Sequence, residues 1–388
     1  MSEAKTRYSS EQSKPDQGEI LRFHLPALLG QPVTHANSSC AFTQKVRRFA
    51  TMMADRGHEV IVYCGPEHDV IENVEWVECY PAGAEAPEQI TPGTYAKANL
   101  KAAAEIVDRA EEGDFLGLMQ GLAQQAIAAA LPSVTAVEFG IGHNGSYADF
   151  RVFESYAWMH TVYAAQAANS DIDGKFFDTV IPAYFDAKDF KYKARKKKQV
   201  LYLGRLTDRK GLKVAQDAAV AAKAKLVIAG EGDADIFYGE QVGRVEPAKR
   251  KELLADSMAL IAPSLYIEPF GCVAVEAMLS GTPAITTDFG AFTETVVHGV
   301  TGYRCRTVGE FKWAIENASF LDPAVIRDYA ERNFLVEAIA PKYEAYFEQV
   351  ASVRDGGDGW MDFNGLDEVL RYGLQPPRHV KPPTAKKK

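Results

Sequence analysis

The chain of 388 residues has few cysteines and no long hydrophobic run, and each shortage excludes a class of protein. Its five cysteines are scattered and form no CxxC pair, so neither a disulfide framework nor a structural zinc site is supported. No apolar run approaches the roughly 18 residues of a membrane span, so none is expected. Residues 1–18 lack the apolar core of a signal peptide, which favours a cytoplasmic protein.

An excess of positive charge is also absent. The net charge is −9, which argues against nucleic-acid binding through overall charge but leaves room for a local basic patch. Hydrophobic residues make up 47% and charged residues 24% of the chain, as in ordinary globular proteins. This length and composition predict about two or three domains, each with its own core.

Short apolar runs alternate with helical patterns along most of the chain. We predict buried parallel strands at residues 59–63, 133–139, 199–203, 225–229 and 259–262. Helices are predicted around the apolar face of residues 42–53, at 101–109 and at 211–222. Strands and helices that alternate at this spacing predict an α/β fold with doubly wound sheets.

The alternation is interrupted before a basic run at residues 191–198, where six of eight residues are Lys or Arg. Such runs are usually solvated, so an interdomain linker is expected here. The predicted units are a first Rossmann-like domain at 1–185, a second at 186–335, a helix at 336–355 that crosses back to the first domain, and a flexible basic tail at 356–388.

Two glutamates eight residues apart form the most informative motif. Glu268 follows an apolar strand, and a Pro-Phe-Gly turn separates it from a helix that begins near Gly271 and carries Glu276 on its second turn. The N–H groups of a first helical turn attract anions, and carboxylates accept hydrogen bonds from sugar hydroxyls. The motif therefore predicts a ligand with both phosphates and hydroxyls.

Two glycine-rich turns follow neighbouring strands of the same predicted sheet. Gly204-Arg205 and Lys210 leave the end of one strand, and Gly230-Glu231-Gly232 leaves the end of the next. Open α/β sheets bind ligands at this edge, and two cations there match a diphosphate. Each turn alone is weak evidence, because exposed cations and GxG sequences are common.

Taken together, these elements resemble the retaining glycosyltransferases of the GT-B type, most closely the family-4, glycogen-synthase-like group. The shared elements, in order, are Gly204-Arg205-Leu206, Lys210-Gly211, Gly230-Glu231-Gly232, Pro263-Ser264, Glu268 with Glu276, Gly281-Thr282-Pro283, and Gly290 with Glu294. The resemblance is strong over residues 200–303 and weaker in the first half. It implies two Rossmann-like domains with a cleft between them and a transferase that needs no metal or other cofactor.

The resemblance implies a role for each position. Arg205 and Lys210 would hold the donor diphosphate and stabilise the departing charge. Glu268 would face the donor sugar, Glu276 would bind the ribose hydroxyls, and Glu294 would lie near the sugar or phosphate. The further donor-binding positions, in part through backbone contacts, would be Gly204, Gly230, Gly243, Arg244, Val245, Phe270 and Gly271.

The first half should hold the acceptor, and it departs from the family pattern. Gly30 stands alone where the family has a glycine pair near the donor phosphate. His143, in a glycine-rich loop, is a candidate hydrogen-bond donor to the sugar or to the developing charge. Arg151 and Glu154 are weaker candidates for contacting the acceptor.

Several alternatives remain open on the sequence. Asp171-Ile172-Asp173 imitates a metal-binding DxD motif, but it follows Asn169-Ser170 and is better explained by capping at a helix start. The acceptor hydroxyl could belong to a glycan, a lipid, a small molecule or a DNA base, the last because of the basic linker and tail. A catalytically silent nucleotide-sugar-binding protein or a GT-B epimerase is a further alternative. A sugar phosphorylase is disfavoured, because no lysine motif for pyridoxal phosphate is present.

Overall fold

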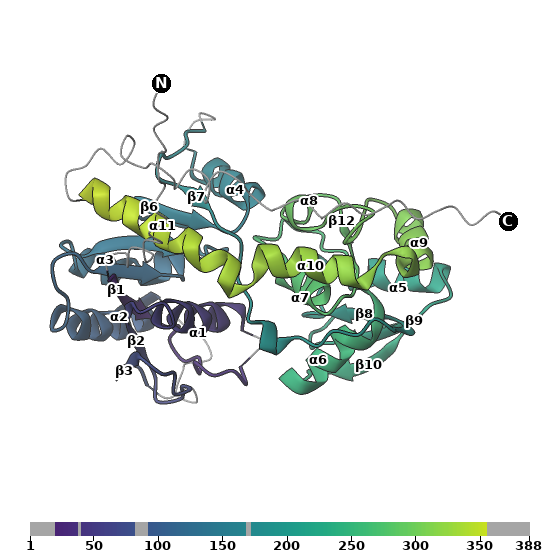
Figure 1. Cartoon of the computed structure of the whole chain (residues 1–388), viewed down its shortest axis with the longest axis horizontal. Helices are drawn as coiled ribbons and strands as arrows, with labels where there is room; N and C mark the ends of the chain where they lie inside the picture. Colours follow the sequence, from purple (N-terminus) through teal and green to yellow (C-terminus); the bar gives the residue numbers. More distant parts are fainter. Residues whose placement is uncertain (1–19, 38–39, 82–91, 168–171, 355–388) are drawn as a thin grey trace, which may run out of the picture.

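The protein folds around two parallel β-sheets that lie side by side. The structure, a computed structural model, describes residues 20–37, 40–81, 92–167 and 172–354 (Figure 1). Every strand pair in both sheets is parallel, and helices cover the sheets. Because both faces are covered, the strands are continuous apolar runs. The predicted doubly wound α/β architecture is confirmed.

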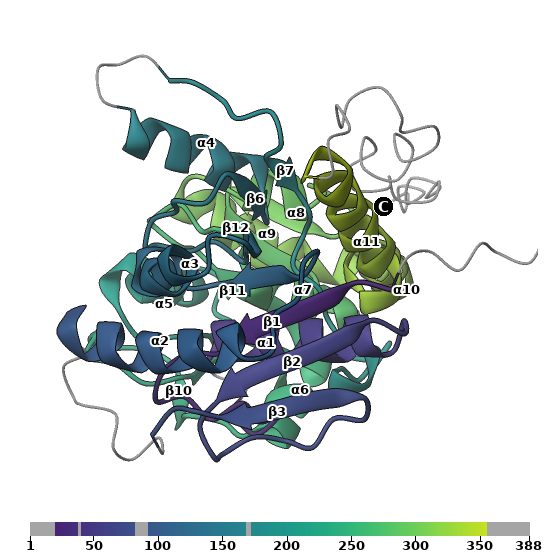
Figure 2. The ribbon, with the colours of Figure 1, turned by 90° about the vertical axis from the view of Figure 1, so that its left-hand side faces the viewer.

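The first sheet has seven strands in the order β3-β2-β1-β4-β5-β6-β7. In Figure 2 the domain that contains this sheet faces the viewer. Its strands are β1 (Arg22–Pro26), β2 (Glu59–Cys64), β3 (Val74–Glu78), β4 (Phe115–Leu118), β5 (Thr135–Phe139), β6 (Phe150–Phe153) and β7 (Thr179–Val180). Its helices are α1 (Ala41–Ala54), α2 (Pro92–Val107), α3 (Gln125–Ala130) and α4 (Tyr156–Gln166). The strand order reverses beside β1, which makes a crevice at the carboxyl ends of the strands.

The second sheet has six strands in the order β10-β9-β8-β11-β12-β13. Its strands are β8 (Lys197–Leu203), β9 (Lys225–Ala229), β10 (Glu240–Gly243), β11 (Ser257–Ala262), β12 (Ala284–Thr287) and β13 (Gly302–Cys305). The helices that follow them are α5 (Leu212–Ala221), α6 (Pro247–Asp256), α7 (Cys272–Leu279), α8 (Phe292–Thr295), α9 (Val308–Asn317) and α10 (Pro323–Phe334).

The last helix, α11 (Val336–Arg354), crosses from the second sheet to the first (Figure 1). Its buried face packs against the aromatic core of the first sheet through Ile339, Tyr343, Tyr346, Phe347 and Val350. Two chain segments therefore join the domains, and they are paired. The Phe185 N–H donates to the Phe334 carbonyl at 2.9 Å, and the Val336 N–H donates to the Phe185 carbonyl at 3.0 Å.

The basic run is largely exposed, as expected of a linker, but several of its lysines bind groups of the second domain. Lys193 bonds the carboxylates of Glu252 and Asp256 on α6. Lys196 is half-buried and donates to Thr282 Oγ1 at 2.8 Å and to two backbone carbonyls, and burial lowers the pKa of its ammonium to about 8. These cations fasten the linker to the second domain because α6 supplies acids that the linear pattern does not place beside them.

The DxD-like segment is also not at a helix start. Helix α4 ends at Gln166, and residues 172–175 have no helical structure, so the capping interpretation was wrong for Asp173. Asp171 and the predicted basic tail at 356–388 lie outside the described residues. No helix in the described ranges is long and apolar enough to cross a bilayer.

Candidate functional site

Glu268 lies at the centre of the candidate site, in the loop that joins β11 to α7. Its side chain is 7% exposed. Oε1 accepts hydrogen bonds from Lys210 Nζ at 2.7 Å and from Ser264 Oγ at 2.6 Å, and Oε2 accepts from the Tyr266 hydroxyl at 2.7 Å. These three donors hold both carboxylate oxygens of Glu268 in one orientation.

The turn after Glu268 positions the start of α7. Phe270 is buried in the core of the second domain, which fixes the loop. Gly271 adopts a φ of +82°, and a Cβ on this residue would lie 2.4 Å from the ring of Phe292, so only glycine fits without strain. The helix begins at Cys272, and its first-turn N–H groups have no partners within the helix and point out of its N-terminus. This end of α7 is suited to bind an anion.

Three cations gather beside this helix, at the carboxyl edge of β8. Lys210 is shared with Glu268, and its Nζ lies 5.0 Å from the ring centre of Tyr266. The Arg209 guanidinium lies 4.8 Å from the same ring. Arg205 is exposed, and no ion pair to it is found in the described part of the chain. Among the described residues, the one ion pair found to these three cations is that of Lys210 with Glu268.

The glycine turns bring the loops after β8 and β9 into contact. A Cβ on Gly230 would lie 1.8 Å from the Gly204 carbonyl oxygen, so the backbones pass closer than any side chain allows. The Gly230 N–H donates to the Gly243 carbonyl at 2.8 Å, which joins the end of β10 to this surface. Arg244 and Val245 follow at this sheet edge, where the base of the ligand was predicted. The sequence thus placed the turns at Gly204 and Gly230 on one edge correctly.

Glu276 lies on the second turn of α7, as predicted, and is 8% exposed. Its Oε2 is bound to the guanidinium of Arg250 on α6. The pair borders a cavity of about 340 Å³ between the domains. The first domain contributes His35, Gln44 and Arg48 to this cavity. Sequence reasoning missed Arg250, because it lies in a run of surface-type basic residues with no distinguishing spacing.

His143 faces the site from the first domain. Its ring centre lies 5.6 Å from that of Tyr266 in the second domain and 4.8 Å, edge to face, from that of Trp158. Burial lowers its pKa, with a further lowering by Arg209 that Glu268 partly offsets. The imidazole is therefore neutral around pH 7, with one nitrogen free to donate and the other to accept.

Glu294 is bonded to the first domain. Its carboxylate accepts hydrogen bonds from the backbone N–H groups of Tyr156 at 2.9 Å and Ala157 at 2.8 Å, both at the start of α4 in the first domain. The neighbouring Ser155 hydroxyl donates to the Pro269 carbonyl at 2.7 Å. These contacts cross between the domains, so Glu294 contacts protein at the position where a ligand contact was expected.

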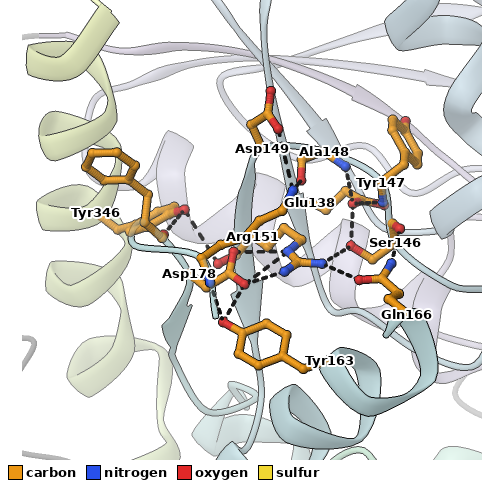
Figure 3. A network of polar contacts seen from close by, with 12 residues as sticks. Glu138, Ser146, Tyr147, Ala148, Asp149, Arg151, Tyr163, Gln166, Asp178 and Tyr346 are labelled. Carbon is orange, nitrogen blue, oxygen red and sulfur yellow. Dashed lines mark hydrogen bonds and ion pairs between the residues drawn. The ribbon is translucent and has the colours of Figure 1, made fainter. Parts of the chain in front are cut away.

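Arg151 has a structural environment that argues against the predicted acceptor contact. It is 1% exposed, and its guanidinium bonds both carboxylate oxygens of Asp178, the Gln166 side chain at 2.9 Å and the Ser146 hydroxyl at 3.4 Å (Figure 3). The Tyr163 hydroxyl donates to Asp178 at 2.7 Å. A guanidinium that is this buried, and whose three nitrogens all bond to protein groups, is not accessible to an acceptor.

Glu154 is also buried, and its Oε2 accepts a hydrogen bond from Lys45 Nζ on α1 at 2.7 Å. The pair is close enough to α7 that its charges act on the Cys272 thiol, whose pKa burial raises to about 12. Glu154 therefore lies near the site without facing open solvent. Gly30, in contrast, borders a small hollow formed by first-domain residues such as Gly65 and Pro81.

In the described ranges, no group of three or more His, Cys, Asp and Glu side chains is arranged to hold a metal ion. Arg205, Arg209, Lys210 and the N-terminus of α7 supply positive charge that an anionic ligand would attract. The site thus combines a cationic surface, one buried carboxylate and a second carboxylate at a cavity. This combination can bind a diphosphate together with hydroxyl groups.

Comparisons with known proteins agree with this site. Residues 185–319 match the family of glycosyl transferases group 1. The chain is 32% identical over 168 residues to an uncharacterized glycosyltransferase of Methanocaldococcus jannaschii, which covers 38% of this chain and 41% of that protein. It is 34% identical over 148 residues to the glycogen synthase of Mycobacterium tuberculosis, covering 33% of this chain and 36% of that protein. The matches therefore span about two fifths or less of these relatives' length.

Solved structures share the fold over a larger part of the chain. A glycosyltransferase involved in avilamycin A biosynthesis, AviGT4, has a TM-score of 0.64 at 20% identity and covers 86% of this chain and 98% of its own. Sucrose-phosphate synthase from Thermosynechococcus elongatus has a TM-score of 0.64 at 18% identity, with coverage of 86% and 100%. HepE of Anabaena, solved with UDP and glucose, has a TM-score of 0.61 at 18% identity, with coverage of 86% and 100%. The chain therefore has the GT-B fold, and the resemblance to the group 1, family-4-like glycosyltransferases is confirmed.

Proposed function

We propose that the protein is a retaining glycosyltransferase that moves a hexose from a nucleotide diphosphate donor, most simply a UDP-sugar, to a hydroxyl acceptor. The observation that carries the proposal is the joint placement of Lys210, Glu268 and the N-terminus of α7 at the boundary between the domains, where His143 faces Tyr266. The cations and the helix end suit a diphosphate, and the carboxylates suit hydroxyls. HepE, which shares the fold, was solved with UDP-glucose, and this supports the choice of donor.

The proposed chemistry uses the residues of both domains. Arg205, Lys210 and the α7 N-terminus hold the diphosphate and stabilise the charge that develops as the sugar departs. Glu268 orients Lys210 and accepts from a sugar hydroxyl, while Glu276 accepts from the ribose. The bond between the sugar C1 and the phosphate oxygen breaks, and a bond to the acceptor oxygen forms on the same face. The acceptor proton passes to the departing phosphate oxygen, so no protein nucleophile and no metal take part.

The proposal is tested first by thermal shift with a panel of nucleotide sugars. A bound donor stabilises the fold by mass action, so one sugar nucleotide should raise the melting temperature more than its nucleoside monophosphate does. Transfer to water or a hydroxyl acceptor is then followed with and without a chelator, and the anomer of the product is read by NMR. An inverted anomer or activity lost with the chelator would overturn the retaining or metal-independent part.

The same experiment separates the enzyme from a silent binding protein. Stabilisation by a donor without any turnover would favour the silent protein. The basic run offers little support for a DNA acceptor, because Lys191, Lys193 and Lys197 are bonded to acids of α6. DNA binding with a steep salt dependence would reverse this conclusion.

A further inference from the structure

The start of helix α4 touches the second domain at two points. Glu294 on α8 accepts from the N–H groups of Tyr156 and Ala157, and Ser155 donates to the carbonyl of Pro269, which directly follows Glu268. Figure 1 shows α4 and α8 as neighbours across the boundary between the two sheets. The second contact therefore reaches the loop that carries the central carboxylate of the site.

Both contacts are favoured by the geometry of a helix start. The N–H groups of the first turn have no partners within α4, and the helix dipole favours a negative charge there. Glu294 supplies that charge from the other domain. Ser155 is the N-cap of α4, since its Oγ accepts from the Trp158 N–H at 3.1 Å, and the same hydroxyl has its proton available for Pro269. The contact thus uses groups that an open arrangement would leave to water.

The two sides of the contact are each anchored in their own domain. Helix α4 is fastened to β6 and to Asp178 through Tyr163 and Gln166, which share the buried guanidinium of Arg151 (Figure 3). The Tyr346 hydroxyl on α11 donates to the Phe177 carbonyl beside this network at 2.8 Å. These contacts tie the start of α4 to the rest of the first domain.

Helix α8 is held with equal firmness in the second domain. Phe292 on α8 is 1% exposed. Its ring packs against Gly271, the residue just before α7, where any side chain would collide with it. Arg304 donates to the Thr293 carbonyl at 2.8 Å. The contacts at Glu294 and Pro269 consequently join elements that are each packed into their own domain.

We propose that Glu294 and Ser155 are positioning residues that dock α4 onto the Glu268–Gly271 loop and hold the two domains together. The docking also sets His143 against the site, because Trp158 of α4 packs on its ring and His143 packs on Tyr266. The kinetic consequence of this inference rests on the proposed function. Its structural part does not, since the contacts form between protein groups alone.

The structural part is tested by amide hydrogen exchange on the full chain without ligand. Glu294→Ala should speed exchange at Tyr156 and Ala157 by roughly tenfold, the order expected for losing a charged partner at a helix N-terminus. Glu294→Gln keeps one acceptor oxygen and should give an intermediate change. The control is Glu316→Ala, which removes an exposed acid of the second domain. Unchanged exchange at Tyr156 and Ala157 in Glu294→Ala overturns the proposal.

Ser155 allows capping to be separated from docking. Ser155→Asp keeps an oxygen that caps α4 but cannot donate to Pro269, whereas Ser155→Thr keeps both abilities. Small-angle scattering should show a larger radius of gyration for Ser155→Asp combined with Glu294→Ala, at an unchanged circular dichroism spectrum, and wild-type dimensions for Ser155→Thr. Wild-type dimensions in the double variant would also overturn the proposal.

The kinetic part is tested with the donor found by thermal shift. A lower population of the docked form reduces apparent donor affinity by the same factor, and saturating donor restores the form. Glu294→Ala should therefore raise the donor KM by the factor by which it lowers the docked population, and leave kcat within a few-fold. A raised KM without faster exchange would make Glu294 a direct donor ligand and overturn the positioning role. No turnover in wild type would refute the proposed function, while the exchange result still decides the docking.

Discussion

The ammonium of Lys210 lies 2.7 Å from Oε1 of Glu268, so the principal cation and the principal carboxylate of the site form one unit. Ser264 and Tyr266 also donate hydrogen bonds to this carboxylate, so it does not depend on Lys210 alone. An ammonium has three N–H donors, and Glu268 uses one of them. The pair therefore preorganises the cation and does not neutralise the site, because Arg205 and Arg209 remain beside it.

Lys210→Ala should lower kcat by about 10²–10³, the range found when one preorganised donor to a developing charge is removed. The donor KM should change much less, because Arg205 and the α7 N-terminus still bind the phosphates. Steady-state kinetics with the identified donor check this, with Lys213→Ala, on the exposed surface of α5, as the control. Equal kinetics for both variants would remove Lys210 from the mechanism.

Glu276→Ala should weaken donor binding by about ten- to a hundredfold, because the ribose hydroxyls lose their acceptor and Arg250 loses its partner. Isothermal titration with the donor and with the corresponding sugar-free nucleotide should show the same loss. The control is Glu252→Ala on α6, which bonds Lys191 and Lys193 away from the cavity. A loss confined to the intact donor would place Glu276 at the sugar and not at the ribose.

His143 should give activity an acid limb below the ordinary histidine pKa of 6.5, since burial and Arg209 lower its pKa. Below that limb the charged ring faces the site cations and turnover should fall. The unfolded chain binds the proton more readily than the folded one, so this residue's contribution makes folding stability decrease as the pH falls through 6.5. Both pH dependences should shrink in His143→Gln, as measured by rate profiles and denaturant melts. Identical profiles would exclude His143 from the site.

Arg151→Met should lower the free energy of unfolding by about 3–5 kcal/mol, because it leaves the buried carboxylate of Asp178 without its cation. Thermal melts measure the loss, and Arg306→Met at an exposed ion pair should change little. A normal melting temperature combined with a raised acceptor KM would restore the acceptor contact that the sequence predicted for Arg151.

The elements of the fold followed from local pattern. The strands at 59–64 and 225–229 and the helix that begins after Gly271 were predicted because their apolar runs and turn residues are contiguous in the chain. The same holds for the loop that carries Glu268 and for the sheet edge shared by Gly204 and Gly230. The positions of these loops depend on neighbours close in sequence, so the local pattern was enough to predict them.

Contacts between residues that are distant in the chain were not predicted. Arg250 meets Glu276 from another helix, Glu294 meets α4 from the other domain, and Arg151 is enclosed by Asp178 and Gln166. The sequence spacing of these residues does not show whether a side chain is buried and bonded or exposed. The same residue type, with the same charge and size, occurs in both environments. Lys196 shows the same limit within a run that resembles an ordinary solvated linker.

The sequence by itself determined the α/β architecture, the glycine turns and the pairing of Glu268 with Glu276 around one helix start. Periodicity and backbone conformation decide these features within about twenty residues. Only the tertiary structure decided that Lys210 donates a hydrogen bond to Glu268, that His143 faces Tyr266, and that Glu294 joins the domains. These contacts depend on how two separately wound sheets are set against each other, which is fixed by packing across the cleft and by the return of α11.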